Sequence, residues 1–144
     1  MIQENKKLLL QDLCARLPYG VICNTSKGNG HLCSINQTIF GVEYGINIKA
    51  TERDYFNDRE EIIKPYLRPM SSMTEEQKEE LENLGWNFDN FEIHNVNECL
   101  GTYREYVAHS DCSTLIDWLN AHHFDYRGLI DKGLAIEAPE GMYN

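Results

Sequence analysis

The sequence has no long hydrophobic run. No apolar run in its 144 residues reaches the roughly 18 consecutive residues that a membrane-spanning helix needs, so we expect no membrane segment. The apolar run near the N-terminus, Leu8 to Leu10, is interrupted at once by Gln11 and Asp12, and we predict no secretory signal. These features predict a cytoplasmic protein without a membrane partner.

The sequence also lacks a CxxC pair. Its five cysteines are scattered and odd in number: Cys14, Cys23, Cys33, Cys99 and Cys112. Because cytosolic disulfides are rare, we predict free thiols. The alternative is a facing pair of Cys23 and Cys33, which flank a predicted hairpin turn.

The short motifs of nucleotide-binding and hydrolytic enzymes are missing as well. The sequence has no GxxxxGK[ST] phosphate loop, no GxGxxG fingerprint and no GxSxG nucleophile elbow. His31, His94 and His109 show no HxxxH or HxH spacing. The sequence therefore assigns no catalytic residue, no cofactor and no metal, and it favours a non-enzymatic role.

Basic residues are scarce in the second half of the chain. The formal net charge is −10, and residues 74–144 account for all of it with a net −11, because residues 1–73 carry a net +1. Such an acidic surface repels phosphate backbones, so we expect no direct contact with nucleic acid. Two interpretations stay open: a polyanion mimic that attracts a basic protein, and an acidic surface that aids solubility.

The hydrophobic pattern predicts a single α+β domain over residues 1–144. Leu9, Leu13 and Leu17 recur at four-residue spacing and predict a helix over 3–17. Short β-type segments follow, and they predict a small antiparallel sheet that carries this N-terminal helix. The predicted strands are 20–24, 31–36, 38–43 and 45–50, with turns at 27–30 and 44–45, and a loop over 51–58.

The remaining elements are predicted from proline and capping signals. Pro65 and Pro69 predict an extended segment over 64–70, at a sheet edge or draped over the core. Thr74 and Gln77 form a capping box for a helix to about residue 84, and Ser113 caps a second helix over 114–122. We expect these C-terminal helices to pack on one side of the sheet. One strand or an irregular aromatic loop is predicted at 86–96, a short strand at 103–107 and a short helix at 127–132 ended by Gly133, with a loose tail over 138–144.

Residues 117–127 hold the densest group of chemically versatile side chains. The predicted ligand-binding residues here are Trp118, His122, His123, Asp125, Tyr126 and Arg127. A metal site on His122, His123 and Asp125 requires the helix to end between the histidines, because neighbouring helical residues point about 100° apart. A general acid–base role for a histidine is the second alternative. The third is structural, with Trp118 in the core, a histidine capping the helix and Asp125 paired with Arg127.

The proline-stiffened segment is a second candidate site. Lys64 and Arg68 supply positive charge, and Tyr66 offers an aromatic face for stacking. The guanidinium of Arg68 suits a phosphate or a carboxylate, and a stiff segment loses little entropy on binding. The structural alternative is a rigid connector that packs Tyr66 and neighbouring apolar side chains.

Three strings carry a resemblance to a known group of proteins. They are LCARLPYG at 13–20, KPYLRPMSSMT at 64–74 and DWLNAHHFDYRGLI at 117–130. In order and spacing they resemble a family of small proteins, without assigned activity, from gut anaerobic bacteria and their phages and prophages. The resemblance covers about a quarter of the chain. It implies a cytoplasmic accessory protein of a bacterial host cell, carried on a mobile element.

These observations lead to one main functional expectation. We expect a non-catalytic accessory protein that binds a host protein or sequesters a small anionic ligand such as a nucleotide signal, and so antagonises a host defence. One alternative is a small hydrolase or transferase that uses His122, His123 and Asp125. The other is an acidic polyanion mimic that binds a basic host protein. The many aromatic residues also make a homo-oligomer an expectation.

Overall fold

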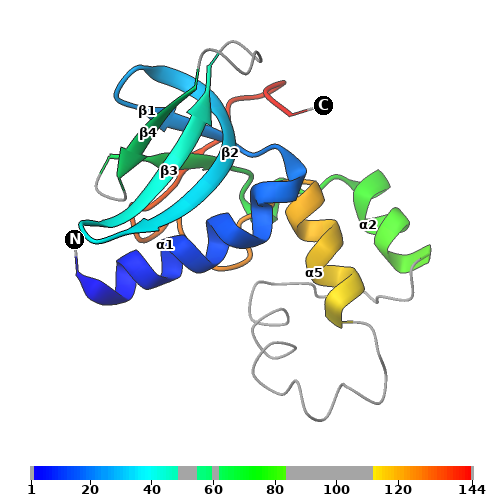
Figure 1. Cartoon of the computed structure of the whole chain (residues 1–144). Coiled ribbons are helices and arrows are strands. Elements are labelled where there is room, and N and C mark those ends of the chain that lie inside the picture. The colour runs from blue at the N-terminus through cyan, green and yellow to red at the C-terminus, as the bar shows by residue number, and fades with distance from the viewer. Residues whose placement is uncertain (1, 49–54, 60–61, 84–111, 144) are drawn as a thin grey trace. The chain divides into compact units, whose positions relative to one another are not determined.

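The computed structural model of the chain describes residues 2–48, 55–59, 62–83 and 112–143. The chain divides into two compact units (Figure 1). The first unit contains Met1–Leu67 and Leu129–Asn144, and the second contains Arg68–Gly128. The prediction of one domain over 1–144 stays a prediction. The elements predicted at 86–96 and 103–107, and the C-cap at Gly85, lie outside the described residues.

The first unit begins with helix α1, Gln3–Arg16, followed by the 3-10 turn η1, Leu17–Tyr19. This confirms the helix predicted over 3–17. Its Leu9 and Leu13 are fully buried in a hydrophobic cluster that also contains Leu32 and Ile46 of the sheet. Apolar residues four positions apart share one face of a helix, and this face therefore anchors α1.

A six-stranded mixed sheet forms the rest of the first unit, in the order β4-β3-β2-β1-β5-β6. All neighbouring strands pair antiparallel except β5 and β6, which are parallel, so the expectation of a purely antiparallel sheet is wrong. The chain thus has an α+β fold. The strands are β1 Ile22–Thr25, β2 Gly28–Thr38, β3 Gly41–Asn47, β4 Tyr55–Arg59, β5 Lys64–Leu67 and β6 Ile136–Glu137.

The first hairpin turns earlier than predicted. Thr25 pairs with Gly28, so the turn lies at 26–27 and the glycines of 27–30 belong to β2. Gly30 lies in β2 and not in the turn, but a glycine is required there for another reason. A Cβ at this position would lie 2.6 Å from the Ile46 side chain and 2.9 Å from the carbonyl oxygen of Asn47, so β3 approaches too closely for any side chain.

Strand β3 is continuous through the turn that the sequence predicts at 44–45. Tyr44 pairs with Ile35 on β2 and Asp58 on β4, and Gly45 is flanked in the same way, so pairing on both sides holds this segment extended. The actual turn lies at Ile39 and Phe40. The loop predicted over 51–58 is also wrong at its end, because residues 55–59 form β4.

The proline segment enters the sheet between two strands and not at an edge. Pro65 of β5 pairs with Cys23, and Tyr66 pairs with Ile136 of β6. Each neighbour of β5 pairs with two of its residues. A ladder this short accommodates a proline, which has no N–H to donate.

The C-terminal tail is ordered, in contrast to the prediction for 138–144. The Ala138 N–H donates to the Leu67 carbonyl at 2.7 Å. The hydroxyl of Tyr143 accepts from the Ile22 N–H at 2.9 Å and donates to the Tyr66 carbonyl at 2.8 Å. It therefore bridges β1 and β5 one residue beyond their last pair. Burial raises the pKa of the Tyr143 phenol, so the hydroxyl stays protonated.

The second unit contains the 3-10 turn η2 Met70–Ser72, helix α2 Glu75–Asn83 and helix α5 Cys112–Ala121. The predicted capping box is confirmed: Thr74 N–H donates to Gln77 Oε1 at 2.9 Å and Gln77 N–H to Thr74 Oγ1 at 3.2 Å. Helix α5 already begins at Cys112, so Ser113 lies inside it and is no cap. The core residues of this unit are Met73, Leu81, Leu115, Trp118, Leu119, Phe124 and Tyr126.

Two further predictions concern thiols and membranes. Cys14, Cys23 and Cys33 are free cysteines, as predicted, and burial raises the pKa of the Cys23 thiol, with the charge of Asp12 adding to the rise. None of the helices in the described part of the chain is both long and apolar enough to cross a membrane.

Candidate functional site

The structure divides the nine predicted site residues between the two units. Lys64 and Tyr66 belong to β5 in the first unit. The others belong to the second unit: Arg68, Trp118, His122, His123, Asp125, Tyr126 and Arg127. Tyr66 and Arg68 are close in sequence, yet they contribute to different hydrogen-bond networks.

Tyr66 takes part in a polar network on the sheet. Its hydroxyl donates to Asn29 Oδ1 at 3.0 Å, and the Asn24 amide donates to the same oxygen at 3.2 Å. Lys64 is exposed on the same strand, in register with Asn24. The Tyr66 ring itself is buried. The predicted role of Tyr66 as a stacking face is therefore not available in this structure.

A turn at the end of α5 separates the two neighbouring histidines. His123 N–H donates to the Asn120 carbonyl at 3.1 Å and Phe124 N–H to the Leu119 carbonyl at 2.9 Å, which is the Schellman arrangement of a helix C-terminus. His123 has a left-handed φ of 64°, a conformation usually left to glycine. The helix thus ends at the histidines, as the sequence-based metal hypothesis requires.

His123 and Asp125 nevertheless lie inside the second unit. Their exposed fractions are 8% and 5%, whereas His122 is half-buried. Within the described residues, no three His, Cys, Asp or Glu side chains gather in an arrangement that holds a metal ion. The predicted trio His122, His123 and Asp125 accordingly forms no such group.

Four planar groups form a continuous stack at the edge of the second unit, which we call the ring stack: Arg68, Phe124, Trp118 and His122. The Arg68 guanidinium lies 4.7 Å from the Phe124 ring centroid. Phe124 stacks on Trp118 at 5.8 Å with 9° between the planes, and His122 lies 4.1 Å from Trp118. Phe124 is fully buried, whereas Arg68 and His122, at the two ends, are half-buried and reach solvent.

The backbone fixes Arg68 beside the turn that ends α5. Arg68 N–H donates to the His123 carbonyl at 2.8 Å, and Asp125 N–H donates to the Arg68 carbonyl at 2.8 Å. In the described part of the chain, its guanidinium donates one hydrogen bond, to Gln77 Oε1 at 3.5 Å. A guanidinium has five N–H donors, so several remain for a ligand. An arginine with its ordinary pKa of 12.5 is charged at neutral pH. Partial burial lowers the pKa of Arg68 from that value.

Helix α2 supplies the polar side of the ring stack. Glu80, one turn after Gln77, accepts a hydrogen bond from Trp118 Nε1 at 3.2 Å. Burial is the main cause that lowers the pKa of His122. The Glu80 carboxylate opposes this shift, and the Arg68 guanidinium adds to it. His122 is therefore mainly neutral at pH 7, with Arg68 and Glu80 as its charged neighbours. A neutral imidazole both donates and accepts hydrogen bonds.

Tyr126 and Arg127 have structural contacts. The buried Tyr126 hydroxyl donates to Asn120 Oδ1 at 2.8 Å and accepts from the Arg127 guanidinium at 2.6 Å. The same guanidinium lies 4.6 Å from the Tyr126 ring centroid. The Arg127 guanidinium is held by Tyr126, and the pairing of Asp125 with Arg127 stays a prediction.

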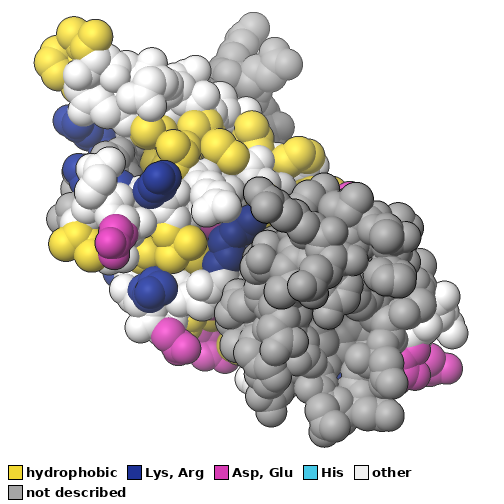
Figure 2. Space-filling view, turned by 90° about the horizontal axis from the view of Figure 1, so that it is seen from below, with side chains coloured by type: hydrophobic (Ala, Val, Ile, Leu, Met, Phe, Trp, Pro, Cys, Tyr) yellow, Lys and Arg dark blue, Asp and Glu magenta, His cyan; other side chains and the backbone are white. Residues whose placement is uncertain are grey.

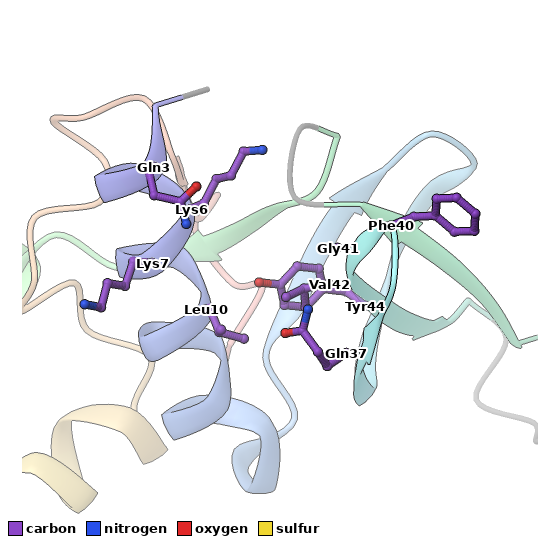
Figure 3. Close-up of a pocket in the computed structure, with 9 residues that line it drawn as sticks. All are labelled: Gln3, Lys6, Lys7, Leu10, Gln37, Phe40, Gly41, Val42 and Tyr44. Atoms are coloured by element: carbon purple, nitrogen blue, oxygen red, sulfur yellow. The ribbon is translucent and has the colours of Figure 1, made fainter.

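The first unit contains a groove that sequence reasoning missed (Figure 3). It has a volume of about 470 Å³ and lies between α1 and the β2–β3 hairpin. Its lining residues are Gln3, Lys6, Lys7, Leu10, Gln37, Phe40, Gly41, Val42 and Tyr44. The spacing of Gln3, Lys7 and Leu10 marks one helical face, but only the fold reveals which strands oppose it.

Sequence reasoning also missed two polar neighbours of the ring stack, Gln77 and Glu80 of α2. The one available signal was their spacing, because Gln77, Glu80 and Leu81 share a helical face and Leu81 is buried. Comparison of the chain with models of protein families, with curated proteins and with solved structures finds no match.

Proposed function

We propose that the chain is a non-catalytic binding protein that holds a small anionic ligand at the ring stack. The observation that supports this proposal is the pairing of a half-exposed guanidinium with a half-exposed neutral imidazole on one aromatic floor. Two hydrogen bonds fix the main chain of Arg68, and its guanidinium lies over the Phe124 ring, so less order has to be gained when a ligand binds.

The chemistry of the ring stack favours an anion that carries a planar group. Arg68 is suited to bind a phosphate or a carboxylate through two parallel hydrogen bonds. His122 adds a hydrogen-bond donor and an aromatic ring that lies against Trp118, and a ligand ring can stack on this aromatic surface. The Glu80 carboxylate disfavours a second negative group near His122 and accepts a hydrogen bond from an amino group. A nucleoside monophosphate combines these features.

The biological setting is part of the proposal. The resemblance of the three strings to small proteins of gut anaerobic bacteria and their phages supports an accessory role in the bacterial cytoplasm. In that setting, sequestration of a nucleotide-like signal would antagonise a host defence. The hydrolase or transferase that uses His122, His123 and Asp125 stays a prediction; the burial of the last two argues for ligand binding instead.

The test uses adenosine 5′-monophosphate as the probe, with adenosine and inorganic phosphate as partial ligands. We expect isothermal titration calorimetry to give tighter binding for the complete nucleotide. Arg68→Gln should weaken it about tenfold or more, because a charge-assisted hydrogen-bond pair is lost. The matched control is Arg127→Gln, which removes an arginine that stacks on Tyr126 outside the ring stack. The control should bind like the wild type.

A second measurement tests the geometry. Nuclear magnetic resonance of the His122 ring follows its pKa, and a bound phosphate beside it should raise that pKa in the wild type but not in Arg68→Gln. Equal nucleotide affinity in wild type and Arg68→Gln would refute the proposed site. Conversion of the nucleotide by the wild type would refute the non-catalytic role.

The acidic helix α2 supports a second candidate, the polyanion mimic. All its acidic side chains are exposed: Glu75, Glu76, Glu79, Glu80 and Glu82. Lys78 offsets one of them through an exposed pair with Glu75 at 3.3 Å. Binding to a basic protein through this surface should weaken steeply as salt increases, and salt-independent binding would exclude it.

A further inference from the structure

The turn between β2 and β3 exposes two large apolar side chains. Ile39 is 92% exposed and Phe40 73% exposed. Two-residue hairpin turns usually contain Gly, Asn or Asp, because those residues tolerate the required backbone angles and water. An isoleucine and a phenylalanine gain nothing from this position in the isolated chain. Adjacent exposed apolar side chains at a tip are typical of an interaction surface.

Hydrogen bonds hold this tip in one conformation. Thr38 Oγ1 donates to the Gly41 carbonyl at 2.8 Å and accepts from the Phe40 N–H at 3.1 Å. The Arg59 guanidinium of β4 donates to the Phe40 carbonyl from the neighbouring strand. The apolar side chains are therefore presented on a preorganised turn, which reduces the entropy lost on binding.

The groove continues from the tip toward α1. Figure 3 shows Phe40 at one end, pointing away from the groove, and Leu10, Val42 and Tyr44 facing one another across its floor. Leu10 and Val42 are partly buried, so the groove exposes apolar surface along its length. The tip adjoins one end of the groove, and we call the two together the hairpin face.

The charges on the hairpin face have one sign. Lys6 and Lys7 are the charged residues that line the groove, and none of its nine lining residues is acidic. Glu4 lies on the same helix but does not line the groove. Figure 2 shows Lys and Arg side chains interspersed among hydrophobic ones over the first unit, with a few Asp and Glu side chains beside them.

We infer that the hairpin face docks an acidic, apolar-containing segment of a partner protein. Carboxylates of the segment meet Lys6 and Lys7, its apolar side chains cover Leu10 and Val42, and Phe40 inserts into the partner. The net charge of −10 does not prevent this contact, because physiological salt screens charges beyond about 8 Å. A concave groove suits a chain segment better than a bilayer plane.

The probe is a synthetic peptide of alternating glutamate and leucine, about 10 residues long, a length that spans a groove of this kind. Control peptides replace glutamate by lysine or leucine by serine. Binding to the full chain is measured by fluorescence anisotropy, and amide shifts in nuclear magnetic resonance locate it. We expect the glutamate–leucine peptide to bind and to shift the amides of Gln37, Val42 and Tyr44.

Two variants and one control define the site. Lys7→Glu should weaken binding about tenfold, because it places a like charge against the peptide. Phe40→Ser should weaken it by a similar factor, and both positions are exposed enough to leave folding intact. Lys132→Glu makes the same charge change on an exposed turn away from the groove and should leave binding unchanged. The ring stack is untouched in all three variants.

Four results would overturn the inference. They are equal binding of the lysine–leucine peptide, absence of binding by the glutamate–leucine peptide, Phe40-dependent binding to phosphatidylserine vesicles with no peptide binding, and Phe40-dependent self-association in analytical ultracentrifugation. The third result would assign the hairpin face to a membrane and the fourth to a second copy of the chain.

Discussion

In the first unit the ion pair of Asp12 and Arg16 is fully buried, with 2.7 Å between Oδ2 and Nε, whereas in the second unit Arg68 and His122 remain half-buried at the surface. Both units have an apolar core, but they use polar side chains differently. The first unit uses them for internal hydrogen bonds such as those of Tyr143. The second unit holds Arg68 and His122 at its surface against aromatic rings. This difference predicts that loss of the buried polar contacts of the first unit lowers stability, whereas changes at the ring stack alter ligand binding.

The largest effect is expected for Asp12→Ala. Removing the carboxylate leaves the fully buried Arg16 without its ion-pair partner, which should lower the free energy of unfolding by about 3–5 kcal/mol. Urea-induced unfolding measures this change. The double variant Asp12→Leu with Arg16→Met should cost less than Asp12→Ala alone, and an equal or larger cost would show that the charge itself is not the cause.

Tyr143→Phe comes next. It removes the hydroxyl that bridges Ile22 and Tyr66, so two backbone groups lose a partner, and we expect a loss of about 1–3 kcal/mol in unfolding free energy. Tyr66→Phe is the matched control. Its hydroxyl bonds an exposed asparagine, which water can replace, so its loss should be smaller. The reverse order in thermal unfolding would contradict the bridging role of Tyr143.

Thr74→Ala tests the first-turn cap of α2. Loss of the bond to the Gln77 N–H should cost about 1 kcal/mol of stability. Because Gln77 also accepts from Arg68, the nucleotide affinity of this variant should fall, whereas Thr114→Ala, an exposed threonine of α5, should leave it unchanged. Unchanged affinity in both variants would mean that Gln77 plays no part in positioning Arg68.

The smallest effect concerns pH. The pKa of His122 is lowered from its ordinary 6.5, mainly by burial, so the unfolded chain takes up a proton before the folded one does. Stability from this residue is therefore present above pH 6.5 and is lost as the pH falls from there to the folded pKa. His122→Gln should flatten that part of a stability-versus-pH curve. An unaltered curve would indicate that His122 is less buried than the ring stack implies.

Local signals allowed part of the fold to be predicted. Leucine spacing located α1, and the capping box located α2, because both depend on residues within one or two turns of each other. Strand β3 was divided in error at Tyr44 and Gly45, since a glycine within a strand-like stretch indicates a turn unless strands on both sides pair with it. The real turn carries Ile39 and Phe40, whose apolar character gave no turn signal.

The candidate site was predicted only in part for a similar reason. Arg68, Trp118 and His122 were named from residue type, but their arrangement depends on a parallel bridge between Arg68 and Phe124, which are far apart in sequence. The left-handed φ of His123 has no sequence signal, whereas Gly133 closes the comparable turn with φ 72° and was predicted as a stop. No local sequence pattern predicts the long-range pairing of β5 with β6 or the contacts of Tyr143.

The position of Tyr143 also has a consequence for synthesis. The first unit is built from residues 1–67 and from 129 onward, so its sheet lacks β6 and the bridging phenol until residue 143 has left the ribosome. By then the whole second unit has already been translated. At roughly 5–20 residues per second, β5 waits roughly 4–15 seconds for translation to pass from Leu67 to Tyr143, and the second unit is synthesised within that interval.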